Sequence, residues 1–216
     1  MSAERWITFD CYGTLVDWQS GFRQILRPVV GARADDVLEA YHSAEPAIER
    51  EMPGASYKTI LNKALERAGA AVQAPIAAGD LDVLADHWHE LPVFADTEAS
   101  LTALRDDGWR LGILTNCDND LFERTRSVFP VRIDMVVTAE EVGNYKPNLA
   151  HFTEFERRSG VARSDWVHAA VSWFHDMQPA RELDLRRVWV DRENTGQDPS
   201  TVTERVANLT ELVAAL

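Results

Sequence analysis

Residues 6–17 read WITFDCYGTLVD, and this stretch decides how the whole chain is interpreted. Residues 6–9 form a short apolar run typical of a buried β-strand, and Asp10 follows it directly. Gly13 then allows a tight turn and a close approach of a ligand to the backbone. In open parallel sheets, ligands bind outside the carboxyl ends of the strands. Asp10 is therefore the first candidate functional residue, with a turn or helix-capping aspartate as the alternative.

Further β-rich runs follow, separated by segments in which apolar residues recur at helical spacing. The predicted strands are 6–9, 111–114, 135–137, 167–171 and 188–190, and the predicted helices between them are 96–107, 119–129, 148–159 and 179–183. This alternation is typical of a parallel sheet covered by helices on both faces. The sequence therefore predicts the α/β fold class, with a Rossmann-like parallel sheet as the core. Residues 200–216 are predicted to form one closing helix.

The segment between the first two predicted strands contains no convincing strand of its own. Its predicted helices cover 21–30, 35–51, 57–70 and 81–91, and Pro46 is expected to kink or restart the second of them. We therefore predict a core made of residues 1–17 and 93–216, with a helical cap of residues 18–92 inserted into it.

Composition argues against several classes of function. The chain has 216 residues with 22 Lys+Arg and 35 Asp+Glu, a formal net charge of −13, which disfavours a partner bound through phosphates. No apolar stretch approaches the ~18 residues needed to cross a bilayer, and the charged N-terminal residues MSAERW are unlike an export signal. We expect a cytoplasmic protein that binds neither nucleic acid nor membranes. Its two cysteines, Cys11 and Cys117, are expected to be buried thiols.

Polar residues also follow the second, third and fourth predicted strands. Thr115 and Asn116 end the second, Lys146 comes shortly after the third, and Ser172 leads to Asp176 after the fourth. Each has an ordinary structural explanation as a turn residue, a surface lysine or a helix cap. If these residues gather at one edge of a sheet, however, the lysine can keep a nearby carboxylate ionised, and an ionised carboxylate can act as a nucleophile.

The segments FDCYGTLVDW, LGILTN, NYKPNLAHF and HAAVSWFHDMQPA, in this order, resemble the four motifs of the haloacid dehalogenase superfamily. The resemblance covers nearly the whole chain, including a helical cap after the first motif. It implies that Asp10 is the nucleophile and that Lys146 positions it. It also implies that Asp176 pairs with the lysine or orders a water, and that Thr14 and Thr115 place hydroxyls beside the nucleophile and the displaced group.

Two positions bear on whether such a chain is a phosphatase or a dehalogenase. Superfamily phosphatases carry a second Asp two residues after the nucleophile, where this chain has Tyr12, a much weaker acid. Val171 stands where an acidic residue normally precedes the serine of the fourth motif, and it cannot bind a hard cation. The chain therefore resembles the metal-independent type II branch, typified by L-2-haloacid dehalogenases. No metal or other cofactor is expected, and Mg²⁺ belongs only to the phosphatase alternative.

The resemblance implies a hydrolase in which Asp10 displaces halide from a small 2-haloacid and water then hydrolyses the aspartyl ester. The chain departs from that branch at Phe152, which replaces a tyrosine, and at Trp173 and Phe174, which replace a polar pair. The cap arginine of that branch is also missing from its expected place. The candidates to replace it are Arg23, Arg27, Arg33 and Arg50.

Other functions stay open at this point. Glu45 and Glu49 lie one helical turn apart near His42, either as a solvated acidic face or as a site for a cationic group. The second interpretation would suit an amino-acid substrate such as azetidine-2-carboxylate. A Mg²⁺-dependent phosphatase and a catalytically silent binding module are the remaining alternatives. The expected partner is a small-molecule substrate, and family resemblance alone suggests a homodimer.

The candidate site residues are of two kinds. The candidate catalytic residues are Asp10, Thr14, Lys146 and Asp176, and the candidate substrate-binding residues are Tyr12, Trp18, Thr115, Asn116, Ser172 and Trp173.

Overall fold

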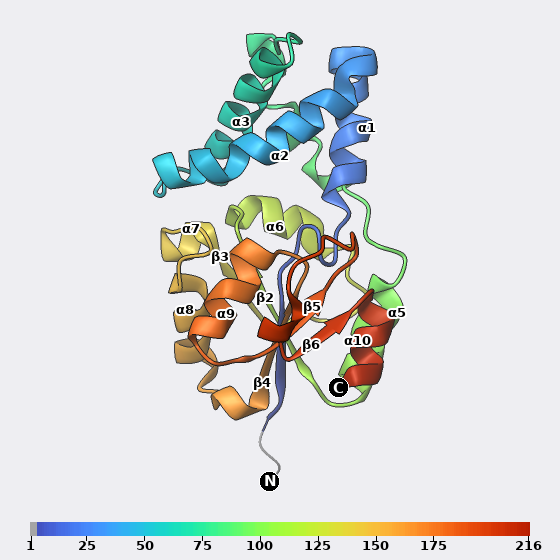
Figure 1. Cartoon of the computed structure of the whole chain (residues 1–216), viewed down its shortest axis with the longest axis vertical. Helices are drawn as coiled ribbons and strands as arrows, with labels where there is room; N and C mark the ends of the chain where they lie inside the picture. The colour runs from blue at the N-terminus through green and yellow to red at the C-terminus, as the bar shows by residue number, and fades with distance from the viewer. Residues whose placement is uncertain (1–3) are drawn as a thin grey trace.

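A six-stranded, fully parallel sheet forms the centre of the computed structural model, which describes residues 4–216 (Figure 1). In spatial order the strands are β3 (Met135–Thr138), β2 (Arg110–Thr115), β1 (Trp6–Phe9), β4 (Trp166–Ala170), β5 (Arg186–Val190) and β6 (Glu204–Val206). The chain builds outward from β1 to β3 and then crosses back to β4. The two directions of winding therefore diverge between β1 and β4, where open sheets of this kind bind ligands. The predicted α/β class and its five strands are confirmed.

Helices cover both faces of the sheet, as Figure 1 shows with α8 and α9 on one side and α5 and α10 on the other. The helices around the sheet are α5 (Thr97–Asp106), α6 (Asn119–Arg126), α7 (Ala139–Val142), α8 (Ala150–Ser159), α9 (Gln178–Glu182) and α10 (Leu209–Ala215). Two separate apolar clusters match the two faces: Ile7 and Phe9 pack with Leu101 of α5, whereas Trp6 packs with Phe155 of α8. This alternation along β1 follows from the period of two in a strand.

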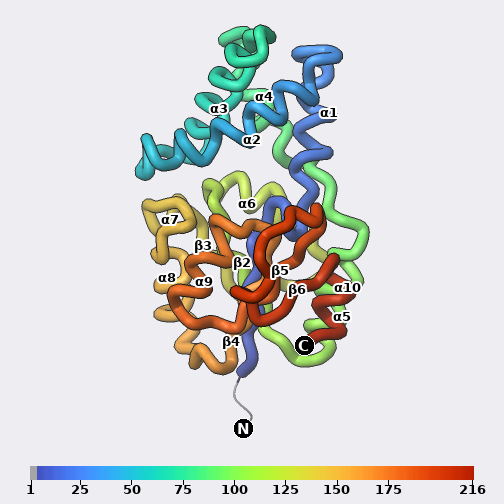
Figure 2. Tube along the Cα trace, in the orientation of Figure 1, coloured from blue at the N-terminus to red at the C-terminus, as the bar shows by residue number. Residues whose placement is uncertain are grey.

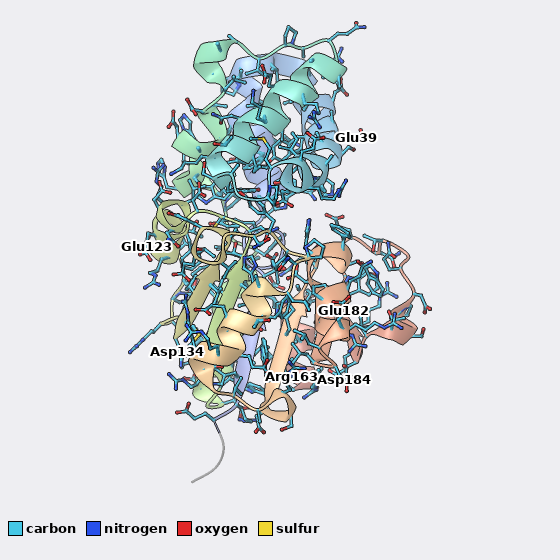
Figure 3. The ribbon with its side chains drawn as sticks, turned by 90° about the vertical axis from the view of Figure 1, so that its left-hand side faces the viewer. Glu39, Glu123, Asp134, Arg163, Glu182 and Asp184 are labelled. Carbon is cyan, nitrogen blue, oxygen red and sulfur yellow. The ribbon has the colours of Figure 1, made fainter. Side chains whose placement is uncertain are left out.

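Four of the α-helices between β1 and β2 in the chain stack over the carboxyl ends of the strands (Figures 1, 2 and 3). These helices, here called the helical insertion, are α1 (Trp18–Val30), α2 (Ala34–Glu51), α3 (Tyr57–Ala71) and α4 (Val83–Asp86). Asp17 caps α1 by accepting a hydrogen bond from the backbone N–H of Ser20 at 3.1 Å. Pro46 lies inside α2, which continues through it.

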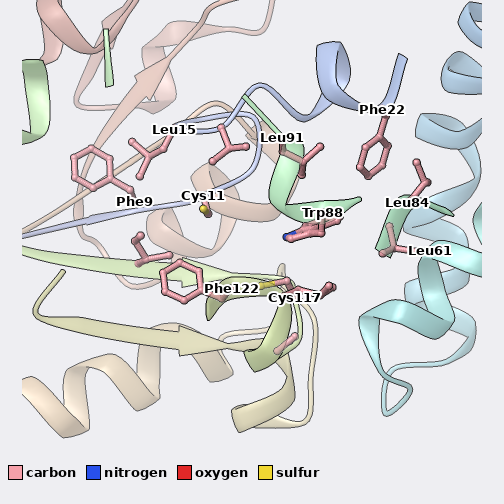
Figure 4. Close-up of a cluster of buried hydrophobic side chains, with 14 of the residues drawn as sticks. Phe9, Cys11, Leu15, Phe22, Leu61, Leu84, Trp88, Leu91, Cys117 and Phe122 are labelled. Carbon is pink, nitrogen blue, oxygen red and sulfur yellow. The ribbon is translucent and has the colours of Figure 1, made fainter. Parts of the chain in front are cut away.

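One apolar core joins the sheet to the insertion (Figure 4). Phe9 and Cys11 lie at its sheet end, Phe22 and Leu61 lie at its insertion end, and Trp88 lies between them. The two cysteines are free and buried, as predicted. Burial raises the pKa of Cys117 to about 12, so this thiol stays protonated at neutral pH.

Two predicted helices are wrong. Residues 81–91 contain only the four residues of α4 and one 3₁₀ turn, because the chain bends at His87 to place Trp88 against Tyr12, which follows β1. Residues 200–216 contain β6 before α10, because residues 204–206 pair with the exposed edge of β5. Asn208 then begins α10 by accepting a hydrogen bond from the N–H of Glu211 at 3.0 Å.

Within the described residues, 4–216, no helix combines the length and the apolar character needed to cross a membrane. The expectation that the N-terminal segment is no export signal falls partly on residues 1–3, which lie outside the described residues.

Candidate active site

Asp10, Lys146 and Asp176 meet at the carboxyl ends of β1 and β4. The Lys146 ammonium donates hydrogen bonds to Asp10 Oδ1 at 2.9 Å, to Asp176 Oδ1 at 2.6 Å and to the Leu114 carbonyl at 2.8 Å. An ammonium has three hydrogens, so all of its donors are used within the protein. Lys146 is only 1% exposed. It therefore orients the two carboxylates and has no donor left for a substrate.

The charges of these three groups depend on one another. Burial alone would lower the pKa of Lys146, but Asp10 and Asp176 outweigh it and raise the pKa above its ordinary value. Burial would likewise raise the pKa of Asp176, yet Lys146 and the neighbouring His168 lower it to about 2. For Asp10, burial is the dominant effect and raises the pKa, with Lys146 opposing it. Asp176 is therefore an anion at neutral pH, paired with a charged lysine.

Thr14 holds the second oxygen of the Asp10 carboxylate. Its hydroxyl donates to Asp10 Oδ2 at 3.2 Å and accepts from the backbone N–H of Val171 at 3.1 Å. The intervening Gly13 has φ of +100°, a conformation that side chains disfavour, and a Cβ there would lie 3.3 Å from the Trp18 indole nitrogen. The turn after β1 thus orients Oδ2 of Asp10, while Lys146 orients Oδ1.

The end of β2 places Thr115 and Asn116 beside this group. Asn116 Oδ1 accepts from the Lys146 N–H at 2.7 Å, and its Nδ2 donates to the Lys146 carbonyl at 3.1 Å and to Glu49 Oε1 at 3.2 Å. Asn116 therefore holds the lysine backbone and links it to the insertion. Thr115 is fully buried and its hydroxyl faces Cys117, with Oγ1 3.6 Å from Sγ.

A cavity of about 650 Å³ lies between this group and the helical insertion. Nine of the ten predicted site residues line it, and the exception is Thr14. Its aromatic walls are Tyr12, Trp18, Phe22, Tyr57, Trp88, Phe94, Trp173 and Phe174. Cavities that are mostly apolar with a few convergent polar groups are the usual form of small-molecule sites.

Three of the predicted substrate-binding side chains are also held by the protein itself. The Tyr12 hydroxyl accepts from Trp88 Nε1 at 2.8 Å, and burial raises its pKa well above the ordinary value. Ser172 Oγ accepts from the N–H of His175 at 3.1 Å. Trp173 packs edge-on against Trp189, with ring centroids 5.0 Å apart. The Tyr12 hydroxyl therefore keeps its proton at neutral pH and is a poor general acid.

Comparison with known proteins agrees with this geometry. A family model described as haloacid dehalogenase-like hydrolase matches residues 4–169. The chain belongs to the haloacid dehalogenase-like hydrolases. It is 30% identical over 193 residues to a phosphoserine phosphatase of Thermus thermophilus, covering 86% of this chain and 76% of that one. It is 23% identical over 212 residues to an (S)-2-haloacid dehalogenase of Pseudomonas fluorescens, covering 94% and 92%.

Solved structures show the same fold. The L-2-haloacid dehalogenase of Xanthobacter autotrophicus with chloropropionic acid covalently bound has a TM-score of 0.85 at 16% identity, covering 98% of this chain and 97% of that one. Another L-2-haloacid dehalogenase gives 0.88 at 19% identity, covering 99% of both chains. The predicted resemblance of this haloacid dehalogenase-like hydrolase to the L-2-haloacid dehalogenase branch is thus confirmed.

Of the four arginines considered from the sequence of this hydrolase, only Arg50 lines the cavity. Arg23 pairs with Asp35, and Arg33 Nε lies 2.7 Å from Asp36. Arg50 lies near the end of α2, is exposed and forms no ion pair with any residue in the described part of the chain.

The sequence pointed to no role for Arg192, which also lines the cavity. Its guanidinium nitrogens lie 3.1 and 3.0 Å from the two oxygens of Asp96, and Nη2 donates to the Thr14 carbonyl at 3.0 Å. Arg192 is therefore bound within the protein, which leaves Arg50 as the unpaired guanidinium beside the cavity.

A buried chain of hydrogen bonds behind Asp176 was also not predicted from the sequence. His168 Nε2 donates to Asp176 Oδ1 at 3.0 Å, a direction fixed by the ionised carboxylate, and its Nδ1 lies 2.9 Å from Thr8 Oγ1. Trp166 Nε1 donates to the same Thr8 oxygen at 2.7 Å. Phe152 packs edge-on against the His168 imidazole, with ring centroids 4.9 Å apart, and does not line the cavity. The available signal was a polar residue inside each of two strands, Thr8 and His168, which pair in register.

The residues of this hydrolase do not fit a hard divalent cation well. Within residues 4–216, no group of three His, Cys, Asp or Glu side chains is placed to hold a metal ion. Asp10 and Asp176 already share the Lys146 ammonium, and Val171 supplies no side-chain oxygen. Mg²⁺ prefers near-octahedral oxygen coordination, which this donor set supplies poorly.

His151 of α8 predicts a pH dependence of stability. Burial and the Lys146 charge lower its pKa from 6.5 to about 3. The unfolded state therefore binds more protons than the folded state between these values, and stability is lost as pH falls below 6.5. We expect His151→Gln, which keeps a donor for the Thr115 carbonyl, to reduce this slope by up to about 1.4 kcal/mol per pH unit. Urea unfolding at several pH values checks the slope, and an unchanged slope would contradict the assignment.

Proposed function

We propose that this hydrolase displaces halide from a small 2-haloacid through an ester on Asp10. The observation that carries the proposal is the Asp10 carboxylate, fixed at both oxygens and facing a largely apolar cavity. A carboxylate in such surroundings is a stronger nucleophile than one in water, because less hydration must be removed before attack. The (S)-2-haloacid dehalogenase relative supports the same reaction.

The hydrogen bonds assign different tasks to the two Asp10 oxygens. Oδ2, which accepts from the Thr14 hydroxyl at 3.2 Å and does not contact Lys146, attacks the carbon, and the halide leaves with the electrons of the broken bond. Oδ1 stays with Lys146 and becomes the carbonyl oxygen of the ester. When water attacks that carbonyl, negative charge develops on Oδ1, where the ammonium stabilises it.

Asp176 is proposed to orient the attacking water. Its Oδ1 is occupied by Lys146 and His168, whereas Oδ2 is buried and has no hydrogen-bond partner among the described residues. A buried carboxylate oxygen without a partner is costly and is normally satisfied by a water or a ligand. The water that cleaves the ester would fill this role, regenerating the Asp10 carboxylate and releasing the 2-hydroxyacid.

The decisive experiment follows the oxygen atoms. A single turnover of L-2-chloropropionate in H₂¹⁸O, with chelator present, should release chloride and place one ¹⁸O in the peptide that contains Asp10. Direct attack of water on the substrate would instead place the label in the product alone. Label in the product alone, or no chloride release from any of a panel of 2-haloacids, would rule the proposal out.

Arg50 is proposed to bind the substrate carboxylate, because it is the unpaired guanidinium at the cavity. We expect Arg50→Ala to raise KM for 2-chloropropionate about tenfold or more, with a smaller effect on kcat. Arg27→Ala is the matched control, since Arg27 is exposed on α1 and does not line the cavity. Equal KM values for the two variants would show that another group binds the carboxylate.

Phosphate ester hydrolysis is the second candidate, because one relative is a phosphoserine phosphatase. The leaving oxygen of an ester needs a proton, and the Tyr12 hydroxyl at the corresponding position is held by Trp88 with a raised pKa. Halide leaves without a proton, so the site suits it better. Magnesium-dependent hydrolysis of p-nitrophenyl phosphate that is lost in Asp10→Asn would favour the phosphatase.

A further inference from the structure

The cavity presents more negative than positive charge to a ligand. The acidic side chains that line it are Asp10, Asp17, Glu45, Glu49, Asp176 and Glu193. Of the basic ones, Lys146 donates all its hydrogens to the protein, Arg192 is paired with Asp96, and His175 lies 3.5 Å from Glu49. His42 stacks on Trp18. Arg50 is the one arginine or lysine of the lining without a partner among residues 4–216, so a purely anionic ligand would leave several carboxylates uncompensated.

Asp10 and Asp176 take part in the reaction, Asp17 caps α1, and Glu193 accepts a hydrogen bond from Gln19 at 2.8 Å. Glu45 and Glu49 are the acidic residues of the lining that have no such role. They lie one turn apart on α2, and Glu49 is only 5% exposed. The hydroxyls of Tyr41 and Tyr57 donate to Glu45 Oε1, and Asn116 donates to Glu49 Oε1. These neutral donors orient the carboxylates without cancelling their charge.

The outer oxygens of the two glutamates lack comparable partners. No hydrogen bond from a described residue reaches Glu45 Oε2 or Glu49 Oε2. The nearest basic atom is His175 Nε2, 3.5 Å from Glu49 Oε2. Burial would lower the pKa of His175, but Glu49, Asp176 and Glu45 raise it, so this imidazole offsets at most one of the two negative charges. Burial and the charge of Glu49 raise the pKa of Glu45, as expected for two carboxylates that share one wall.

Two carboxylates that share one imidazole beside an apolar cavity are unfavourable unless a ligand brings further positive charge. The cavity also holds the nucleophile, so that ligand is the substrate. Aromatic side chains, including Trp18 and Tyr57, line the same space, and aromatic rings favour a cation.

We propose that Glu45 and Glu49 bind a cationic nitrogen of the substrate, so that the preferred substrates are small amino acids with a leaving group on carbon. This inference rests on the proposed attack by Asp10 and leaves that step unchanged: the Asp10 oxygen bonds to carbon, the leaving group departs with its electron pair, and the ammonium keeps its proton. A zwitterion also matches the adjacent charges on α2, with its carboxylate on Arg50 and its ammonium on the glutamates.

The test measures binding, separately from turnover. The probes are 2-hydroxybutyrate and 4-amino-2-hydroxybutyrate, two product analogues that carry no leaving group and differ only in the ammonium. Calorimetry should show that the amino compound binds about tenfold or more tightly, the usual range for a charged hydrogen bond. In the double variant Glu45→Gln, Glu49→Gln, which keeps the acceptors for the tyrosines and Asn116, the ratio should fall to about one.

Glu39→Gln is the matched control. Glu39 is exposed on the same helix, does not line the cavity and lies on the insertion, away from the sheet (Figure 3). This control should keep the preference for the amino compound. Equal binding of the two probes by the native protein, no binding of the amino compound, or a preference that survives in the double variant would overturn the inference. A preference without ¹⁸O on Asp10 would instead overturn the proposed function and leave the cation site standing.

Discussion

Replacing Asp10 with asparagine is expected to abolish turnover of 2-haloacids, lowering kcat by about 10⁴-fold or more. The amide oxygen is a poor nucleophile, so the first bond to carbon does not form. Asparagine has nearly the same shape and still accepts the hydrogen bond from Lys146, so the variant should fold. Chloride release from L-2-chloropropionate, measured with chelator present, checks the loss.

Asp120→Asn is the control for this experiment. Asp120 is exposed on α6, pairs with Lys58 and does not line the cavity, so its loss removes one negative charge far from the reaction. We expect its kcat to equal that of the native protein. Chloride release that persists in Asp10→Asn at more than about one per cent of the native rate would point to a different nucleophile.

Replacing Lys146 with methionine is expected to lower both activity and stability. The variant keeps an unbranched side chain, one atom shorter and uncharged, and leaves Asp10 and Asp176 buried beside each other without a cation. Removing one partner of a buried ion pair costs about 3–5 kcal/mol of unfolding free energy. Loss of the charge that stabilises Oδ1 during ester hydrolysis should lower kcat by about 10³-fold.

The lost stability in Lys146→Met should depend on pH. Without the ammonium, the pKa of each buried carboxylate rises above its value in the unfolded chain, so the folded variant binds more protons than its unfolded state. Its stability relative to the native protein therefore improves as pH falls from about 7 to about 5. Urea unfolding at both pH values measures this. Lys58→Met, which removes an exposed lysine, serves as the control, and equal losses at both pH values would contradict the pairing.

Local pattern was sufficient to predict most of the elements. The strands 6–9, 111–114 and 135–137 are apolar runs bounded by turn residues, and the structure has β1, β2 and β3 there. β6 could not be found this way, because three residues such as Glu204 to Val206 become a strand only when β5 supplies the hydrogen-bond partners. The same holds for residues 81–91, where a tertiary contact of Trp88 outweighs helical spacing.

The sequence predicted which residues belong to the candidate site, but it did not predict the contacts that they make. Asp10, Thr14, Lys146 and Asp176 stand at strand ends or follow them, and the structure brings all four together. Asn116 was predicted to contact substrate, but its side chain holds the Lys146 backbone. Nothing in the sequence separated Arg50 from the other insertion arginines, because its place at the cavity depends on how α2 lies over the sheet.

The sequence by itself determined the α/β class, the order of the strands along the chain and the polar residues at their ends, because these depend on periodicity over a few neighbouring residues. Only the tertiary structure decided which groups carry charge toward the ligand. Lys146 and Asp10 are 136 residues apart in the chain and meet at 2.9 Å, whereas Glu45 and Glu49 share only the His175 imidazole, 3.5 Å from Glu49, in the same cavity. Burial and pairing of charges arise from packing between distant segments, and these two properties set the chemistry of the site.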